Sequence, residues 1–192
     1  EVAVDFGTAY LRIYLPGAGL VLETPSLIAL DEQTGQIVAA GHEARELRGR
    51  QPAGIHVIQP IKDGVVENVQ AAAALLRWTF DRVWQGRPTL RFQLLLTTPS
   101  DCPPLELQAA REAASAARAI KVTLIEEAVA SALGAEMQAE QAHASVVVDI
   151  GAGTTDLAVV SRGALVQGRT LRLGSGALDQ AILEYLRQER GI

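Results

Sequence analysis

Two copies of one strand–turn–strand pattern, near opposite ends of the chain, constrain the fold more than any other feature. The first copy reads VAVDFGTAYLRIYL (residues 2–15) and the second reads VVDIGAGTTDLAVV (residues 147–160). In each copy an apolar run ends in an aspartate, a turn of glycine and small residues follows, and a second apolar run returns. Each copy therefore predicts a β-hairpin, with Asp5 or Asp149 at the end of its first strand.

The sequence between the two copies predicts strands and helices in alternation. Extended segments are expected at 19–31, 31–41 (after a turn centred on Thr34-Gly35), 55–66, 92–99, 121–127 and 163–174. Helices are expected at 42–50, 69–84, 105–119, 128–137 and 177–190. Asn68 is placed to cap the second of these helices. This order predicts an α/β protein with a layered sheet.

The net charge, the cysteine count and the length of the apolar runs limit the partners and the cell compartment that this chain can have. The 192 residues carry a formal net charge of −5, which argues against nucleic acid as the main partner, because phosphate contacts need clustered Lys and Arg. A single cysteine, Cys102, allows no intrachain disulfide and favours a reducing cytoplasm. No secretory signal is recognisable, and no apolar run approaches the roughly 20 residues that a membrane-spanning helix needs.

The residue types in both turns are suited to binding phosphate. Glycine lets the main chain approach a ligand closely, and consecutive N–H groups in such a turn form an anion-binding concavity. The hydroxyls of Thr8, Thr154 and Thr155 add further donors. An aspartate beside the turn would repel a bare phosphate, but it can share a hydrated Mg²⁺ with one. One such hairpin is more often structural, whereas two facing hairpins predict a clamp for a polyphosphate.

In combination these motifs resemble the actin-like ATPase superfamily, which includes actin, sugar kinases and heat-shock chaperone ATPases. Within it they are most similar to the MreB-type cell-shape filament proteins. The first phosphate motif of that family resembles VDFGTAYLRIYL, its connecting segment LIEEAVASALGAE and its second phosphate motif VVDIGAGTTDLAVVSRGALV. The likeness continues through GLVLETPSLIALDEQTGQIVAAGHEARELRGR, IHVIQPIKDGVV and RTLRLGSGALDQAILEYLR, and so covers essentially the whole chain.

The resemblance implies a fold and a domain plan. The fold would be α/β, of the ribonuclease-H-like actin type, with a mixed sheet flanked by helices. Residues 1–144 would form domain I, with a small inserted subdomain at about 31–66, and residues 145–192 would begin an incomplete domain II. ATP and Mg²⁺ would bind between the two domains.

The resemblance also implies a role for each motif residue. Asp5 and Asp149 would lie near the metal, Thr154 near the γ-phosphate, and Glu127 would orient the attacking water, so that Glu127 and Thr154 are the candidate catalytic residues. The candidate nucleotide-binding residues are Asp5, Gly7, Thr8 and Ala9 in the first loop and Gly151, Ala152, Gly153, Thr154 and Thr155 in the second.

Other polar residues near these motifs are expected to be structural. Asp156 is interpreted as a solvent-facing or turn-capping residue, and Glu126 as structural, because adjacent strand residues point in opposite directions. His42, His56 and His143 lack the spacing of metal ligands. Cys102, beside two prolines, is expected to be inert.

The sequence departs from the family pattern at three motif positions and in length. Ala128 stands where the family usually has proline, which would loosen a helix start. Ala152 replaces a glycine of the second loop, and Tyr10 replaces a small polar residue beside the first; both would crowd the ligand. The chain ends at Ile192, before the family's adenosine-binding loop, so we expect a fragment rather than a natural half-length relative.

The expected function is an ATP-binding and hydrolysing filament protein that directs cell shape and works with cell-wall synthesis proteins. The alternatives are a non-polymerising, sugar-kinase-like enzyme and a nucleotide-sensing scaffold with little hydrolysis. The expected location is the cytoplasm, with a peripheral membrane contact through residues 84–92. In that segment Trp84, Leu90 and Phe92 either enter an anionic surface or simply pack at the ends of a helix and a strand.

Overall fold

The computed structural model describes residues 1–85, 91–137 and 143–191. The chain forms two compact units, one of residues 1–98 with 102–125, the other of residues 99–101 with 126 onward. The domain boundary expected at residue 145 stays a prediction.

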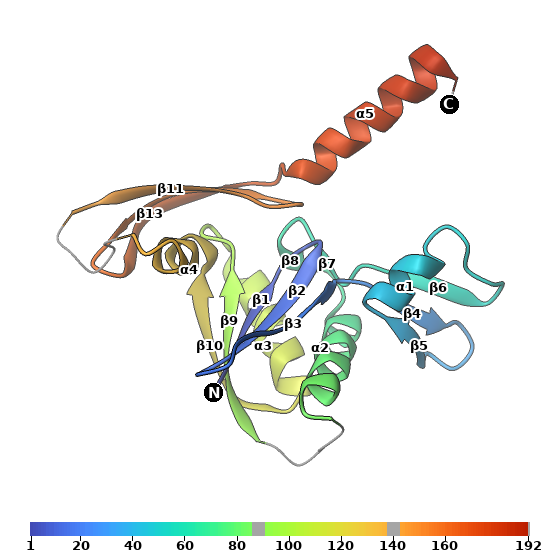
Figure 1. The fold of residues 1–192 in the computed structure, drawn as a ribbon, viewed down its shortest axis with the longest axis horizontal. Helices are drawn as coiled ribbons and strands as arrows, with labels where there is room; N and C mark the ends of the chain where they lie inside the picture. The colour runs from blue at the N-terminus through green and yellow to red at the C-terminus, as the bar shows by residue number, and fades with distance from the viewer. Residues whose placement is uncertain (86–90, 138–142, 192) are drawn as a thin grey trace. The chain divides into compact units, whose positions relative to one another are not determined.

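The first unit is built on a five-stranded mixed sheet in the order β10-β9-β1-β2-β3 (Figure 1). β1 runs parallel to β9 and antiparallel to β2, and β2 is antiparallel to β3. The predicted hairpin at 2–15 is confirmed as β1 and β2. The strands are β1 (Val2–Phe6), β2 (Tyr10–Leu15), β3 (Gly19–Pro25), β9 (Phe92–Thr98) and β10 (Ala119–Glu126).

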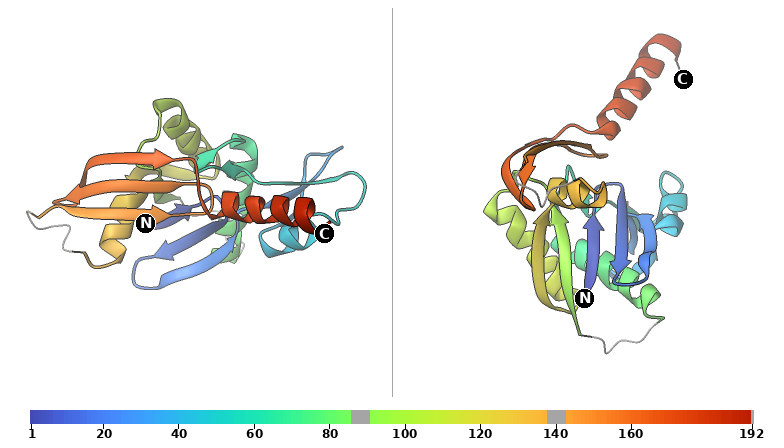
Figure 2. Two further views of the ribbon diagram at one scale, coloured as in Figure 1. Left: turned by 90° about the horizontal axis from the view of Figure 1, so that it is seen from above. Right: turned by 60° about the vertical axis from the view of Figure 1, so that its left-hand side comes forward.

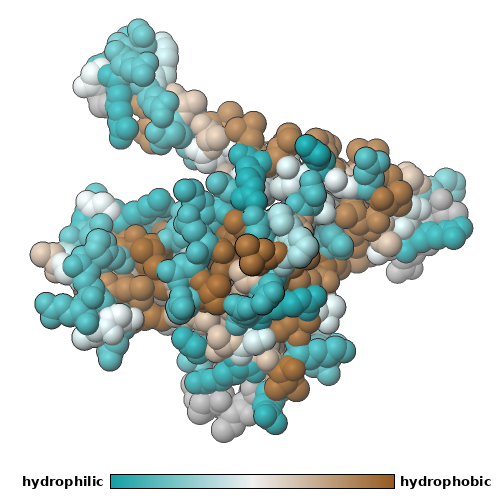
Figure 3. Space-filling view, turned by 180° about the vertical axis from the view of Figure 1, so that it is seen from behind, coloured by the Kyte–Doolittle hydropathy of each residue, from teal (hydrophilic) through white to brown (hydrophobic). Residues whose placement is uncertain are grey.

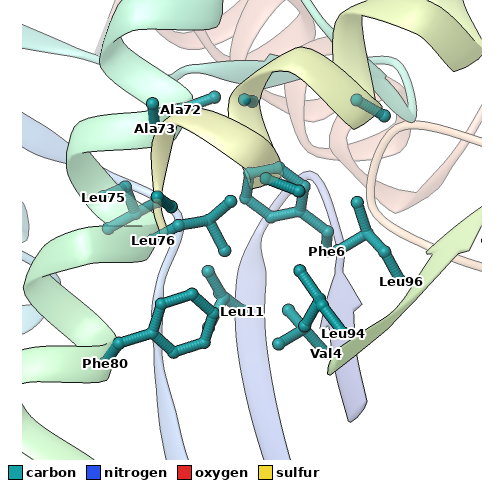
Figure 4. Packing of buried hydrophobic residues seen from close by; sticks show 14 of the residues in the cluster. Val4, Phe6, Leu11, Ala72, Ala73, Leu75, Leu76, Phe80, Leu94 and Leu96 are labelled. Atoms are coloured by element: carbon teal, nitrogen blue, oxygen red, sulfur yellow. The ribbon is translucent and has the colours of Figure 1, made fainter. Parts of the chain in front are cut away.

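Two helices, α2 (Val69–Val83) and α3 (Pro104–Ala116), supply the helical side of this unit's core. The strands alternate, so one face of β1 and β9 carries Val4, Leu94 and Leu96, which are buried against the helices. Figure 4 shows Leu76 and Phe80 of α2 pointing toward these side chains. Burial of this apolar face fixes the end of β1, and with it the predicted first loop.

The predicted cap of α2 is confirmed, since the Asn68 side chain accepts a hydrogen bond from the Ala71 N–H at 2.9 Å. At the other end of α2, the Trp84 ring stacks on Phe80 and contacts Phe92, with ring centroids 5.3 and 4.7 Å apart. These contacts favour packing as the role of Trp84 and Phe92. Residues 86–90, which include Leu90, lie outside the described residues.

A smaller sheet in the order β5-β4-β6 packs with α1 (His42–Leu47) around its own apolar cluster. Its strands are β4 (Ile28–Asp31), β5 (Ile37–Ala40) and β6 (Ile55–Ile58), and a short hairpin of β7 (Ile61–Lys62) and β8 (Val65–Val66) follows. The single strand predicted at 19–31 is wrong: it is two strands in two sheets. β3 ends at Pro25, which has no N–H to continue a ladder.

The second unit contains a three-stranded antiparallel sheet in the order β11-β12-β13, with α4 (Glu127–Gly134) packed against it (Figure 2). The strands are β11 (Ser145–Ile150), β12 (Thr155–Ser161) and β13 (Ala164–Leu171), which confirms the second predicted hairpin. One face buries Val147, Ala158 and Val160. The opposite face leaves apolar residues exposed, and Figure 3 shows apolar side chains over this sheet.

The last helix, α5 (Ser175–Arg190), stands where a helix was predicted, and its apolar residues Leu178, Ile182 and Tyr185 are exposed. Within the described residues, no helix is both long and apolar enough to cross a membrane. The prediction of an α/β chain with a mixed sheet and flanking helices is confirmed.

Candidate functional site

The first predicted phosphate loop, Gly7 to Ala9, joins β1 to β2 and is closely held. Ser26 donates twice to it, from its hydroxyl to the Gly7 carbonyl at 2.7 Å and from its N–H to the Ala9 carbonyl at 2.9 Å. A Cβ on Gly7 would lie 2.8 Å from the Tyr10 carbonyl oxygen. The turn therefore requires glycine at position 7, because no larger residue fits so close to the backbone.

Thr8 is fixed by the segment around the β7–β8 hairpin. The Gln59 side-chain amide donates to the Thr8 carbonyl at 2.6 Å, and the Gly64 N–H donates to the Thr8 hydroxyl at 2.9 Å. In the second bond the hydroxyl acts as acceptor, so its own hydrogen can still be donated to a ligand. The turn between β7 and β8 thus helps to hold the first loop, through the Gly64 N–H.

Asp5, the candidate metal ligand of this loop, is paired with a cation. Arg12 Nη1 lies 2.9 Å from Asp5 Oδ2, and Arg12 Nε bonds Glu23 at 2.6 Å. The Thr97 hydroxyl lies 3.5 Å from the other Asp5 oxygen. Partial burial alone would lower the pKa of Arg12, but hydrogen bonds and charge attraction from Glu23 and Asp5 outweigh it, so that its pKa is raised.

Tyr10 is held beside the loop by α1. Its hydroxyl accepts a hydrogen bond from Arg45 Nη1 at 2.8 Å, and the Arg12 guanidinium carbon lies 5.8 Å from the centre of its ring. The hydrogen bond from Arg45 fixes the position of the Tyr10 ring. Whether the ring crowds a ligand stays a prediction.

The second predicted loop joins β11 to β12. The Gly151 N–H donates to the Thr154 carbonyl at 2.8 Å, which closes the turn around Ala152 and Gly153. Thr154 is only 5% exposed. Asp149, near the end of β11, accepts a hydrogen bond from the Ser131 hydroxyl at 2.6 Å.

The start of α5 packs directly on this loop. The Ser175 and Gly176 N–H groups donate to the carbonyls of Gly151 and Ala152 at 3.0 and 2.9 Å. A Cβ on Gly174 would lie 2.5 Å from the Ala152 carbonyl. The Thr155 hydroxyl donates to the Leu173 carbonyl at 2.7 Å, so that the segment following β13 fixes the loop from one side.

Glu127 is the first residue of α4, and an acidic side chain there is favoured by the helix dipole. Ser131 lies one helical turn further on, on the same side of α4, and bonds Asp149. The second unit therefore joins α4, the helix that begins at Glu127, to Asp149 through Ser131. Ala128, in the position where family members usually have proline, is fully buried inside a regular helix start.

Asp156 is not a solvent-facing residue: it is 1% exposed. One of its oxygens accepts hydrogen bonds from the Ser100 N–H at 2.8 Å and the Thr170 hydroxyl at 2.7 Å. It thus ties the 99–101 segment to β12 and β13. Its role in the structure is to support the sheet beneath the second loop.

The donor set is compatible with Mg²⁺ held jointly with phosphate. Within residues 1–85, 91–137 and 143–191 no three His, Cys, Asp or Glu residues cluster as a metal site. Mg²⁺ does not require such a cage, since one or two carboxylates, phosphate oxygens and water satisfy it. Asp5 and Asp149, one at each loop, are of this kind.

Sequence reasoning missed several residues that hold the two loops. They are Arg12, Ser26, Gln59 and Gly64 at the first loop, and Ser131, Gly174 and Gly176 at the second. A sequence signal exists for Ser131, which stands four residues after Glu127 on a predicted helix. The others depend on contacts between segments far apart in the chain.

Solved structures resemble this chain closely. The crystal structure of MreB5 of Spiroplasma citri bound to ADP matches with a TM-score of 0.89 and 34% identity, over 100% of this chain and 57% of that one. The same protein bound to AMPPNP matches with a TM-score of 0.86 and 34% identity, over 98% and 56%. The chain thus has the actin-type fold predicted from its motifs.

The sequence comparisons define the family. The MreB/Mbl protein family model matches residues 1–192, and the chain belongs to this family. The cell shape-determining protein Mbl of Bacillus subtilis is 35% identical over 98% of this chain, and the cell shape-determining protein MreB of Escherichia coli is 36% identical over 100%. The chain spans 57% and 56% of these two relatives, about half their length.

Proposed function

We propose that this chain is the phosphate-binding part of an actin-like ATPase whose filaments direct cell shape and wall synthesis. The observation that carries the proposal is the pair of hairpins, each with an aspartate at or near the end of its first strand and a glycine-containing turn. The family membership and the nucleotide-bound state of the Spiroplasma citri structures support the same conclusion.

The proposed ligand is ATP with Mg²⁺. Backbone N–H groups of residues 7–9 and 152–154 and the hydroxyls of Thr8 and Thr154 donate to phosphate oxygens, with Thr154 assigned to the γ-phosphate. The predicted donor Thr155 instead gives its hydroxyl hydrogen to the Leu173 carbonyl. Asp5 and Asp149 would hold the metal, directly or through water. When bound, the metal neutralises phosphate charge.

We assign hydrolysis to a water held by Glu127. The Glu127 carboxylate orients the water and accepts its proton while the water oxygen bonds to the γ-phosphorus and the bond to the bridging oxygen breaks, which yields ADP and phosphate. Supporting this assignment, Glu127 starts the helix whose next turn bonds Asp149.

In the intact protein, we propose that nucleotide turnover regulates head-to-tail assembly. Head-to-tail contacts are heterologous and non-closing, which gives an open filament. A cytoplasmic location, contact with cell-wall synthesis proteins and peripheral membrane contact through 84–92 belong to the same proposal. For the membrane contact the described residues offer little support, because Trp84 and Phe92 pack on Phe80 and on each other.

Sedimentation and phosphate release by the intact protein test this function. With ATP we expect the wild type to pellet and to release phosphate. Glu127→Ala should still pellet but lose phosphate release, whereas Glu126→Ala, one residue earlier at the helix N-cap, should retain both. ATP turnover without pelleting would favour a sugar-kinase-like enzyme, and binding without turnover would favour a nucleotide-sensing scaffold.

A further inference from the structure

A charged row crosses three strands of the main sheet beside the first loop. We use the name charged row for Asp5 on β1, Arg12 on β2 and Glu23 on β3, which are paired directly opposite one another in the strand register. Arg12 bridges the two acids, at 2.9 Å to Asp5 and 2.6 Å to Glu23. The side chains are 32%, 36% and 46% exposed, in chain order, so that water screens these charges only in part.

The charged row places a fixed cation where a bound metal is expected to act. The Asp5 carboxylate stands two residues before the turn that is assigned to phosphate. Without a cation it would repel the phosphates of a metal-free nucleotide. Arg12 neutralises it before any metal arrives, although its charge is shared with Glu23.

We propose that Arg12 is a positioning residue that holds Asp5 neutralised and thereby reduces the dependence of nucleotide binding on Mg²⁺. This inference rests on the proposed function, because it assumes that the first loop binds phosphate. Arg12 acts through Asp5. Glu23 limits the effect, because it competes with Asp5 for the same guanidinium.

The consequences for two substitutions have opposite signs. Arg12→Met removes the cation, so a metal-free nucleotide meets an uncompensated Asp5, whereas Mg²⁺ restores binding by neutralising Asp5 itself. Glu23→Gln keeps the Arg12 cation and removes the second carboxylate that competes for it, so that Arg12 neutralises Asp5 more completely. Both substitutions break the bridge to Glu23, so a purely structural role of the charged row would move both in the same direction.

The test measures binding of a fluorescent ATP analogue to the intact protein, once with Mg²⁺ and once with EDTA. The quantity of interest is the Kd in EDTA divided by the Kd in Mg²⁺. We expect Arg12→Met to raise this ratio about tenfold, as expected for one partly screened charge at contact distance. Glu23→Gln should lower it, and Arg77→Met, which removes an arginine on α2 that bonds the Ala116 carbonyl, should leave it unchanged.

The outcomes separate this inference from the proposed function. An unchanged ratio in Arg12→Met, or equal shifts in the Arg12 and Glu23 variants, overturns the role of Arg12 and leaves nucleotide binding intact. Absence of binding by the wild type in both buffers overturns the proposed function and the inference with it. If Arg12→Met does not fold, Glu23→Gln decides: a lowered ratio supports the proposal, and an unchanged or raised ratio overturns it.

Discussion

Asp156 shows how one buried carboxylate supports the second loop. It lies on the buried face of β12, where its neighbours on that face are Ala158 and Val160. A buried carboxylate is costly unless it is hydrogen-bonded, and here the donors are the Ser100 N–H and the Thr170 hydroxyl. The residue therefore secures a chain segment that is more than fifty positions away in sequence.

Replacing Asp156 should destabilise the protein. Asp156→Ala leaves the Ser100 N–H and the Thr170 hydroxyl without this acceptor, and we expect a loss of about 2 kcal/mol in the free energy of unfolding. Urea unfolding measures it. Asp179→Ala, on the exposed surface of α5, is the control and should stay within about 0.5 kcal/mol of the wild type. Equal stability of the two variants would contradict the structural role of Asp156.

At this scale the sequence predicted the types of residue at each turn but not their partners. Asp5 could be placed at a strand end because the apolar run stops there. Its pairing with Arg12 could not, because it depends on strand register. Asp156 was assigned to solvent or a turn because a lone acid in an apolar strand gives no sign of the Ser100 backbone that it meets.

Among the elements, α2 owes its start to its cap. The Asn68 side chain satisfies an N–H that has no partner within the helix. We expect Asn68→Ala to cost about 1 kcal/mol of unfolding free energy. Gln70→Ala, at an exposed position two residues later, should cost little. A loss no greater for Asn68→Ala than for Gln70→Ala would show that the cap contributes nothing.

The junction between β13 and α5 is the element that shapes the second loop. A methyl group on Gly174 would meet the backbone of Ala152 at 2.5 Å, so Gly174→Ala must displace the loop. We expect a loss of about 1–3 kcal/mol in stability, together with weaker ATP binding by the intact protein. The matched control is Gly134→Ala at the end of α4, where an added Cβ meets nothing within 4 Å. If Gly174→Ala bound ATP as tightly as the wild type, the junction between β13 and α5 would have no role in nucleotide binding.

The elements themselves were largely predictable, because apolar periodicity and turn residues are local signals. Both hairpins and the five helices stand where the sequence put them, with shifts of one to three residues at most ends. The segment 55–66 was one exception, because β6 lies in one sheet and β7 and β8 form another. The segment 19–31 was the other. Its apolar run continues past Pro25, but the chain leaves one sheet and enters another, which only the packing of both sheets decides.

At the scale of the whole molecule, the actin-type fold followed from the order of motifs rather than from any single one. Each hairpin is an ordinary structural feature. What distinguished this fold from other α/β chains is that one hairpin precedes, and the other follows, a strand that ends at Glu126 and leads into Glu127. The contacts that hold the loops, from Gln59 at the first and Gly174 at the second, required the folded chain.

The central proposal is that both turns bind nucleotide phosphate. Calorimetric titration of the intact protein with Mg²⁺ and ATP tests it most directly, in the wild type, Thr8→Val, Thr154→Val and the control Thr123→Val on the exposed surface of β10. Each loop variant removes one hydroxyl donor at nearly constant shape, and Thr8→Val also removes the acceptor of the Gly64 N–H.

We predict one saturable site per chain, weakened roughly tenfold by Thr8→Val and by Thr154→Val, as expected for loss of one hydrogen bond to a charged group, and unaffected by Thr123→Val. Absence of binding in the wild type, or an affinity that responds to only one of the two loops, would contradict the account.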